Sequence, residues 1–237
     1  MNNMRNLPSA EPLLQVDAIE VPASGTRRPL TLSLDLRAGE LQLIHSPDVD
    51  LSTSIADLLL GLRRSDRGSV RFDGARWDEM PEAEAFRLRG RIGRVLTHGN
   101  WITTWSVMDN VLLPARHHTV MPAGQLRELA CGLARQFGLP GLPVLLPGEC
   151  AAADLERAAC VRAFLGRPRL VILEHPLDDG GSGLLPALMS AVQRLRRRGG
   201  AVIWMTRDRS LLERRDISAD RRYRIVGGLL LDQEHGA

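Results

Sequence analysis

The chain has 237 residues, of which 44% are hydrophobic and 25% charged, and its formal net charge at pH 7 is +3. These values are ordinary for a soluble globular protein that buries a full core as one large domain, or as one domain with a subdomain. No apolar run approaches the length of a membrane-spanning helix, and the first residues lack the apolar stretch of a signal peptide. We therefore expect a protein that is cytosolic, or peripheral on the cytosolic side of a membrane.

Every basic residue of the chain other than histidine is an arginine, because the sequence contains no lysine. Arginines cluster at residues 194–198 and again between residues 207 and 224. Such a patch could meet nucleic acid or anionic lipid. Acidic residues such as Asp208 and Glu213 stand between the arginines, and no nucleic-acid motif or interleaved aromatic residue accompanies them. A nucleic-acid partner is therefore not favoured.

The first third of the chain predicts two strands, a buried strand and a helix. Residues 1–12 read as a disordered lead. Residues 13–21 and 30–36 alternate in polarity, which predicts antiparallel strands. Residues 41–44 are continuously apolar, as in a strand covered on both faces, and a helix is expected over about residues 53–62.

The stretch between that strand and that helix occupies the place of a phosphate-binding loop, whose pattern is G-x-x-x-x-G-K-[S/T]. Glycines let backbone N–H groups wrap the phosphates, and the lysine neutralises their charge. Here the sequence is SPDVDLST, so side chains replace the glycines, Ser52 replaces the lysine, and only Thr53 is retained. The simpler interpretation is an ordinary strand-loop-helix in which Asp50 or Ser52 caps the helix.

The later part of the chain alternates predicted helices and strands. Thr97 follows a strand-like segment at residues 88–96, and a helix is predicted over residues 125–137. Residues 147–176 read as loop, amphipathic helix, turn and buried strand, with the strand over residues 170–173. A helix over residues 184–198, a strand over 201–205 and strands over 222–226 and 229–232 complete the chain.

The stretches at residues 39–74 and 147–176 resemble the ATP-binding cassette (ABC) ATPases, and the resemblance extends over nearly the whole chain. The residues that stand in the family's places are Gly39-Glu40, Gly61-Leu62, Gly68, Phe72-Asp73-Gly74, Arg162-Ala163, Pro168 and Pro176. The resemblance implies an α/β protein with the ABC-type P-loop NTPase fold. A mixed, mostly parallel core sheet would carry an antiparallel β-subdomain and a helical subdomain. We expect a single domain over residues 13–237, with the helical subdomain at about residues 98–153.

A narrower resemblance lies at residues 106–122, which read S-V-x-D-N-V-x-x-P-x-R-x-H-T-x-x-P. This pattern is similar to that of the ATPase of the Mla phospholipid-transport systems, which are of the Mce-associated type. It implies a membrane permease as partner, a dimer with a second copy or with an active ABC ATPase, and a peripheral location on the cytoplasmic side of the inner membrane.

The contact with such a permease is expected at Trp101, Trp105 and Arg116. The two tryptophans could equally be core anchors of the helical subdomain. His117 and His118 are expected to be polar surface residues, because adjacent histidines without further ligands rarely bind a metal. No metal site is predicted.

By the same resemblance, nearly all the positions that bind and hydrolyse nucleotide carry other residues. The nucleotide-binding positions are Ser46, Asp48, Val49, Asp50, Leu51, Ser52 and Thr53, and the signature positions are Cys150, Ala151, Ala152, Ala153 and Asp154. The remaining positions are Thr97 in the Q-loop, Glu174 and His175 in Walker B, Gly181 in the D-loop and Arg207 in the switch. No residue is assigned a catalytic role, although Glu174 and His175 are the candidates for metal contact and general base.

Three functions are compatible with this pattern. The chain is expected to be a pseudo-ATPase subunit with a structural or regulatory role on a Mla-like lipid transporter, and no cofactor is then expected. The first alternative is an active, divergent ATPase that uses ATP and Mg²⁺. The second is a basic module that binds nucleic acid or an anionic surface on the same fold.

Overall fold

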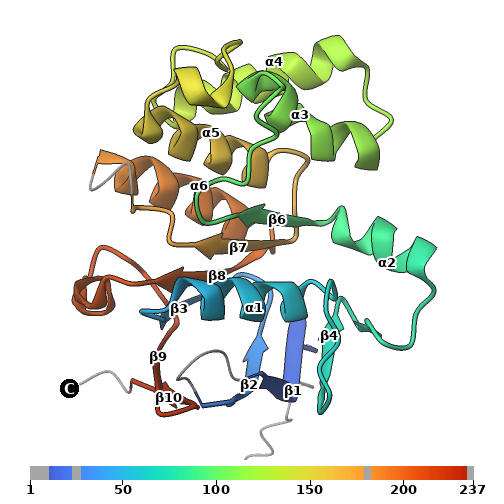
Figure 1. Cartoon of the computed structure of the whole chain (residues 1–237), viewed down its shortest axis with the longest axis vertical. Helices are drawn as coiled ribbons and strands as arrows, with labels where there is room; N and C mark the ends of the chain where they lie inside the picture. The colour runs from blue at the N-terminus through green and yellow to red at the C-terminus, as the bar shows by residue number, and fades with distance from the viewer. Residues whose placement is uncertain (1–10, 23–27, 179–182, 234–237) are drawn as a thin grey trace, which may run out of the picture.

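The computed structural model describes residues 11–22, 28–178 and 183–233. Their strands form one mixed sheet in the order β5-β4-β1-β2-β10-β9-β3-β8-β7-β6 (Figure 1). Strands β9, β3, β8, β7 and β6 run parallel, whereas β2, β1, β4 and β5 pair antiparallel. This mixed sheet is the architecture that the resemblance to ABC ATPases predicts.

The strands are β1 (Leu14–Val21), β2 (Leu30–Leu36), β3 (Leu41–His45), β4 (Ser69–Phe72), β5 (Ala75–Arg76), β6 (Ile92–Val95), β7 (Leu170–Glu174), β8 (Ala201–Thr206), β9 (Arg221–Val226) and β10 (Leu229–Asp232). The α-helices are α1 (Val49–Leu59), α2 (Glu82–Arg89), α3 (Val107–His118), α4 (Ala123–Gln136), α5 (Ala152–Phe164) and α6 (Leu185–Arg197), and short 3₁₀ turns are η1 (Pro147–Glu149) and η3 (Arg209–Glu213). The other predicted strands and the helices at α4 and α6 are confirmed to within about two residues, and α5 is the helix expected within residues 147–176. The strand-like segment expected at residues 88–96 is shorter, because α2 extends to Arg89 and β6 covers only Ile92–Val95. The expected disordered lead falls mostly on residues 1–10, which lie outside the described residues.

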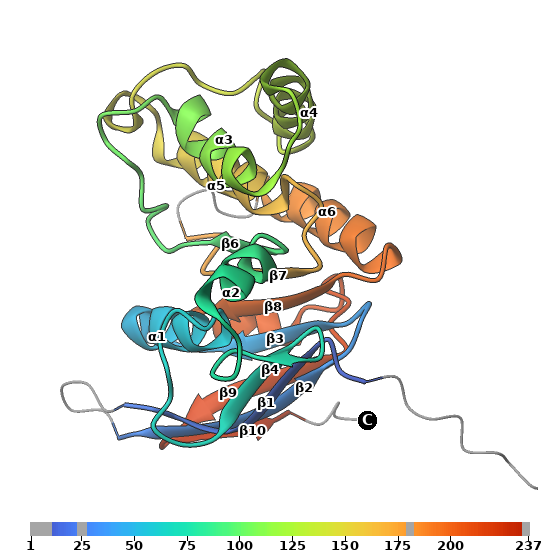
Figure 2. The same cartoon turned by 90° about the vertical axis from the view of Figure 1, so that its right-hand side faces the viewer.

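The central parallel strands β3, β7 and β8 are buried on both faces because each face is covered by a different set of elements (Figure 2). Along β7, Leu170 and Ile172 face the core shared with α1 and the antiparallel strands. Val171 and Leu173 face the core shared with α3, α4, α5 and α6. The continuous apolar run of β7 therefore follows from burial on both sides.

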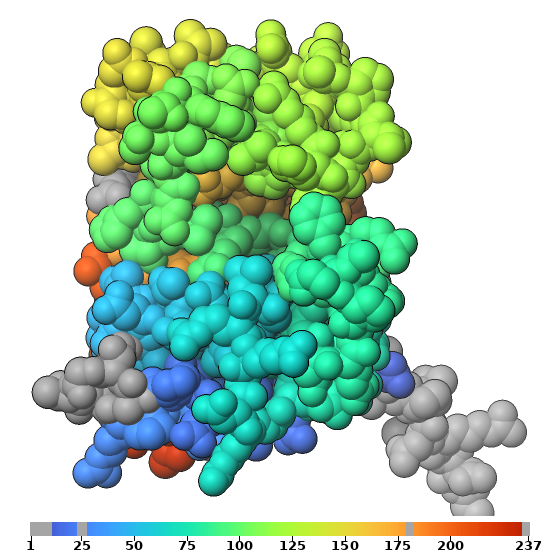
Figure 3. Space-filling view, turned by 45° about the vertical axis from the view of Figure 1, so that its right-hand side comes forward, coloured from blue at the N-terminus to red at the C-terminus, as the bar shows by residue number. Residues whose placement is uncertain are grey.

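Helices α3, α4 and α5 gather at one end of the molecule, away from the antiparallel strands (Figure 1). Figure 3 shows this helical cluster standing over α1 and α2, with a hollow between them. The residue range of the cluster lies close to the helical region expected at about residues 98–153. It is tied to the sheet through α5, which packs on β6.

The contact between β6 and α5 depends on Gly93. A Cβ at residue 93 would lie 1.8 Å from the carbonyl oxygen of Ala163. No side chain fits at that distance, so glycine lets the strand lie directly on the helix. This contact sets the position of the residues that follow β6, including Thr97.

We predict that Gly93→Ala destabilises the protein by roughly 3 kcal/mol, because the added methyl group forces β6 away from α5. The matched control is Gly124→Ala in the first turn of α4, where a Cβ would meet nothing within 4 Å. That change is expected to be neutral or to stabilise by less than about 1 kcal/mol. Denaturant unfolding of both variants measures the difference, and equal unfolding free energies would contradict the argument.

Candidate functional site

Residues 46–53, at the position of a phosphate-binding loop, form a short connection and the first turn of a helix, as the simpler interpretation of the sequence predicts. Helix α1 begins at Val49, four residues before the predicted start, and it ends at Leu59. Its N-cap is Asp48, whose carboxylate accepts a hydrogen bond from the N–H of Leu51 at 2.9 Å. The expected caps, Asp50 and Ser52, were therefore wrong, because Asp48 already satisfies the first turn.

This early start removes the backbone geometry that wraps phosphates. None of residues 46–53 has a positive φ, whereas a loop of inward N–H groups depends on such residues. Asp50 is exposed in the first turn, and Val49 and Leu51 are half-buried. The N–H groups of Leu51 and Ser52 donate to the side chain and the carbonyl of Asp48 instead of a ligand.

Ser52, which stands in the place of the phosphate-binding lysine, is fully buried. Its Oγ lies 2.9 Å from Ser46 Oγ, 3.0 Å from the carbonyl oxygen of Asp48 and 3.0 Å from His175 Nε2. The hydroxyl therefore joins the end of β3, the start of α1 and the end of β7. It points into the protein, where its hydrogen-bonding partners are all internal groups.

His175, at the position of the water-polarising glutamate, lies directly after β7 with a φ of +49°. Its N–H donates to the carbonyl of Met205, and its ring is 4% exposed. Burial lowers the pKa of His175; Arg207 lowers it further, while Asp178 opposes the change. The neutral imidazole is thus held against Ser52 through Nε2, while its Nδ1 is buried without a hydrogen-bond partner among the described residues.

Glu174 and Thr53, the two groups that the resemblance assigns to magnesium, bind each other instead. Thr53 Oγ1 donates to Glu174 Oε2 at 3.0 Å. The other carboxylate oxygen pairs with the Nε of Arg94, on β6, and Arg94 also donates to Asp57 Oδ1 at 2.7 Å. The side chain of Glu174 is fully buried and that of Arg94 is 11% exposed. A tethered guanidinium thus supplies the positive charge that a metal would bring.

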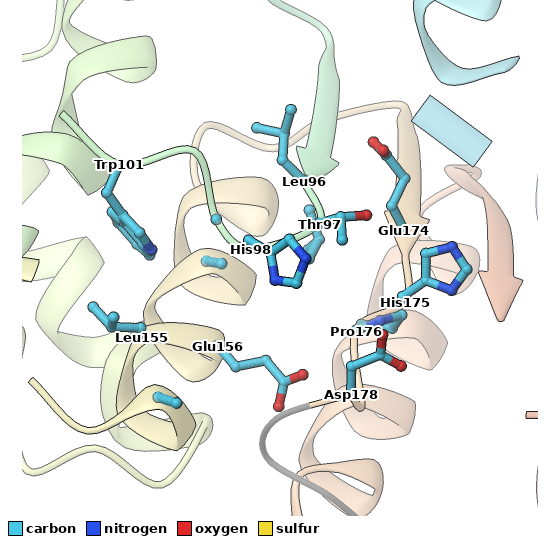
Figure 4. Close-up of a pocket in the computed structure, with 14 residues that line it drawn as sticks. Leu96, Thr97, His98, Trp101, Leu155, Glu156, Glu174, His175, Pro176 and Asp178 are labelled. Atoms are coloured by element: carbon cyan, nitrogen blue, oxygen red, sulfur yellow. The ribbon is translucent and has the colours of Figure 1, made fainter. Parts of the chain in front are cut away.

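The cavity beside these residues is small (Figure 4). It encloses about 120 Å³ and is bounded by Thr97, Glu174 and His175 on the sheet side and by Ala152 and other α5 residues on the helix side. Pockets that hold small-molecule ligands usually measure roughly 300–1,000 Å³. The hydroxyl of Thr97 is buried there without a hydrogen-bond partner in the described part of the chain.

The residues at the signature and switch positions also lie in places that do not form a nucleotide site. Ala151 is the N-cap of α5 and makes no side-chain cap, and of residues 150–154 only Ala152 lines the cavity. Arg207, at the switch position, is half-exposed and pairs with Asp178. The D-loop position, Gly181, lies outside the described residues.

These residues do not fit a magnesium-bound nucleoside triphosphate. The polar groups that would meet phosphate and metal are bonded to one another, and the helix starts where the phosphate loop would be. No lysine exists anywhere in the chain to replace the missing charge. No catalytic step through such a nucleotide follows from this geometry.

The three residues expected at a permease contact are placed differently. Trp101 is half-buried against the core and stacks on Arg162, whose guanidinium carbon lies 4.7 Å from the ring centre. Trp105 is 43% exposed, and Arg116 is on the surface in an ion pair with Asp109. Trp101 is therefore a core anchor, while Trp105 and Arg116 remain available at the surface.

Sequence reasoning missed Arg94 and Asp57. The available signal was an arginine at the third position of a four-residue strand, IGRV, that alternates between half-buried and buried residues. A charged side chain there needs a buried counter-ion, and Glu174 on the neighbouring strand provides it. Among the described residues, no group of three or more histidine, cysteine or acidic residues could hold a metal.

Solved structures resemble this fold closely. The dimeric structure of MJ0796, a bacterial ABC transporter cassette, superposes with a TM-score of 0.82 at 18% identity, covering 94% of this chain and all of that chain. The same cassette in a post-hydrolysis state with ADP and Pi gives a TM-score of 0.80 at 17% identity. These matches confirm the ABC cassette fold that the sequence predicts.

Curated sequences extend the comparison. The lipoprotein-releasing system ATP-binding protein LolD of Chromohalobacter salexigens is 32% identical over 169 residues, which is 68% of this chain and 69% of LolD. The intermembrane phospholipid transport system ATP-binding protein MlaF of Escherichia coli K12 is 30% identical over 162 residues, and that of Haemophilus influenzae is 27% identical over 164. These matches cover 67% and 69% of this chain, and they span 60% and 62% of the two MlaF proteins.

The chain therefore belongs to the family of ABC transporter ATP-binding proteins. Within that family, it is similar to the MlaF type that its sequence pattern at residues 106–122 predicts. A scan against protein-family models finds no match. In the parts of the chain that the structure describes, no helix has both the length and the apolar character needed to cross a bilayer.

We predict that Arg94→Met destabilises the protein by about 3–5 kcal/mol, because it leaves the Glu174 carboxylate buried without a counter-ion. The double variant Arg94→Met with Glu174→Gln is expected to recover most of that loss. As a control, Arg116→Met removes an exposed ion pair and should change stability by no more than about 1 kcal/mol. If all three variants unfold at the same denaturant concentration, Arg94 is not the counter-ion of Glu174.

Proposed function

We propose that this chain is a pseudo-ATPase: an ABC subunit that keeps the cassette fold without nucleotide hydrolysis. The observation that carries the proposal is the internal bonding of the former nucleotide site. Ser52 bonds to His175, and Thr53 bonds to Glu174, which is paired with Arg94. A site whose phosphate-facing and metal-facing groups already have partners gains little from a nucleotide.

We further propose that residues 13–237 act as a single cassette domain with a helical subdomain at about residues 98–153. The system it serves is proposed to be a Mla-like lipid transporter of the Mce-associated type, in which it has a structural or regulatory role. The similarity to MlaF, an ATP-binding protein of intermembrane phospholipid transport, supports this assignment. The pattern at residues 106–122 supports it independently of overall identity.

The partner is proposed to be a membrane permease on whose cytoplasmic side the chain sits as one half of a dimer. The start of α3 carries the surface for it, with Ile102 and Trp105 exposed beside a second exposed apolar segment at residues 144–146. The carbonyl of Leu145 accepts a hydrogen bond from the N–H of Val107 at 2.9 Å, which holds the two segments together. Exposed apolar groups gathered in this way are typical of interaction surfaces.

The first test is nucleotide binding. We expect no magnesium-dependent rise in melting temperature with ATP at submillimolar concentration, and no heat of binding by titration calorimetry. The reason is that a polyphosphate would have to displace the Ser52 to His175 and Thr53 to Glu174 hydrogen bonds. A clear magnesium-dependent stabilisation by ATP would overturn the proposal and favour an active, divergent ATPase.

A second test, of hydrolysis, uses a variant whose residues 46–53 are changed toward the phosphate-loop pattern by Ser46→Gly, Val49→Gly, Leu51→Gly and Ser52→Lys. We expect no phosphate release above the enzyme-free control, because Glu174, His175 and the signature alanines remain altered and catalytic groups act as a unit. The melting temperature should fall, since three glycines loosen the start of α1 and a lysine enters a buried site. Hydrolysis by this variant would mean that Glu174 and His175 form a working pair.

The third test is docking. Trp105→Ala combined with Arg116→Glu is expected to shift the chain from the membrane fraction to the soluble fraction of native cells. The control, Leu62→Ala with Arg63→Glu, changes an exposed apolar residue and an exposed arginine away from α3 and should leave the distribution unchanged. Equal retention of both variants on membranes would place the permease contact elsewhere.

A further inference from the structure

A second cavity, of about 240 Å³, lies between the end of α2, the end of α3 and the turn that joins α5 to β7. We call it the arginine cavity, because five arginine side chains line it and no described carboxylate does. The arginines are Arg87, Arg89, Arg91, Arg162 and Arg167. Figure 3 shows a hollow between α2 and the helical cluster, where these elements meet.

Two glycines bring these arginines together. Gly93 allows β6 to lie on α5. This contact places Arg162, on α5, near Arg89 and Arg91, which precede β6. At Gly90, a Cβ would lie 2.6 Å from the ring of His118, so the chain passes directly beneath the end of α3. His118 in turn contacts Phe86, with ring centres 4.5 Å apart. The cavity is therefore built by the fold and does not arise from flexible surface side chains alone.

Two of the five arginines are already neutralised from outside the cavity. Arg89 pairs with Glu82 at 2.8 Å and donates to two backbone carbonyls. Arg91 pairs with Asp73. Neither carboxylate lines the cavity, so these two guanidinium groups are directed to partners outside it.

The other three arginines have no carboxylate partner in the described parts of the chain. Arg87 donates only to the carbonyl of Ala83, and the exposed guanidinium of Arg167 has no described partner. Arg162 donates to the carbonyl of Gly99 and lies over the ring of Trp101, and burial lowers its pKa to about 10. Arg162 is thus directed to partners outside the cavity, and Arg87 and Arg167 are the two lining arginines whose charge no described acidic group neutralises.

Arg167 also has an unusual backbone. Its φ is +58°, a left-handed conformation that is uncommon for residues other than glycine, and the preceding Gly166 has a φ of +82°. This turn holds the arginine at the mouth of the cavity, between the end of α5 and Pro168. The same side chain lines the neighbouring groove between α4 and α6.

We propose that the arginine cavity binds a phosphate group, carried either by a small soluble molecule or by an anionic lipid headgroup. Guanidinium groups bind phosphate oxygens through paired, charge-assisted hydrogen bonds, which makes arginine well suited to this anion. The volume is below that of pockets enclosing drug-sized ligands, so it suits a headgroup-sized anion. This site is separate from the former nucleotide site and stands whether or not the chain hydrolyses ATP.

The test uses the full chain and compares two double variants that lower the net charge equally. The cavity variant is Arg87→Gln with Arg167→Gln, and the control is Arg63→Gln with Arg215→Gln, two exposed arginines outside the cavity. Thermal shift and titration calorimetry follow inorganic phosphate and glycerol 3-phosphate at constant ionic strength, with chloride as the reference anion. Flotation compares vesicles of equal parts phosphatidylglycerol and phosphatidylcholine with vesicles of phosphatidylcholine alone.

We expect the soluble phosphates to stabilise the wild type and the control, and to bind the cavity variant about tenfold more weakly. Recruitment of the wild type and the control by anionic vesicles, with loss in the cavity variant, would identify the source as a lipid headgroup. Binding of the soluble anions alone would identify a free phosphate compound.

The proposal is overturned if neither probe binds the wild type, or if the cavity variant and the control lose binding equally. The second outcome would mean that only overall charge matters. Both replaced arginines of the cavity variant are exposed and have no carboxylate partner, so the variant is expected to fold. If its unliganded melting temperature falls, the single variant Arg167→Gln replaces it in the same comparison.

Discussion

A buried negative charge at the end of β7 has to be neutralised, and Arg94 neutralises it. The Glu174 carboxylate is fully enclosed, and its two oxygens are taken by Arg94 and by the hydroxyl of Thr53. Because Arg94 also reaches Asp57, one guanidinium joins β6, β7 and α1. In a low-dielectric interior such a charge is tolerated only when its partners are in place. The positions of Thr53, Asp57 and Arg94 around the end of β7 follow from this requirement.

The sheet explains why these groups meet at all. Parallel strands deliver their carboxyl ends to the same edge, so the residues after β3 and β7 converge there. In this chain the convergence produces an internally bonded polar cluster, with Ser52 against His175 on one side and Thr53 against Glu174 on the other. The fold retains the place where ligands bind in such sheets, and a cavity of about 120 Å³ remains there. The arginine cavity lies elsewhere, between α2, α3 and the turn after α5.

Much of the fold could be predicted from the sequence because its strongest signals are long and periodic. The apolar run of β7 and the alternation in β2 each specify a strand, and the glycines and prolines that match the ABC pattern specify the fold. The start of α1 could not be predicted, because several residues in SPDVDLST are capable caps and only the backbone geometry shows that Asp48 takes the role.

The sequence indicates which positions stand at the candidate site, but it does not indicate which side chains contact one another there. The resemblance marks Thr53, Glu174 and His175, yet a sequence does not show which residue on a neighbouring strand faces them. Arg94 comes from β6, 80 residues before Glu174 in the chain, and the pair forms only when the two strands lie side by side. The arginine cavity was missed for the same reason, since its lining residues come from three separate segments.

The ion pair between Arg94 and Glu174 also constrains how this chain can change over generations. On the proposal that this chain is a pseudo-ATPase, gaining a nucleotide site would require removing Arg94, but a protein with only roughly 5–15 kcal/mol of stability tolerates an uncompensated buried carboxylate poorly. Changing Glu174 first leaves a buried guanidinium instead. Replacing either residue alone is therefore expected to give a less stable protein than keeping both or replacing both. The pair therefore resists stepwise replacement, and we expect sequences descended from this chain to vary at surface residues while keeping Arg94 and Glu174.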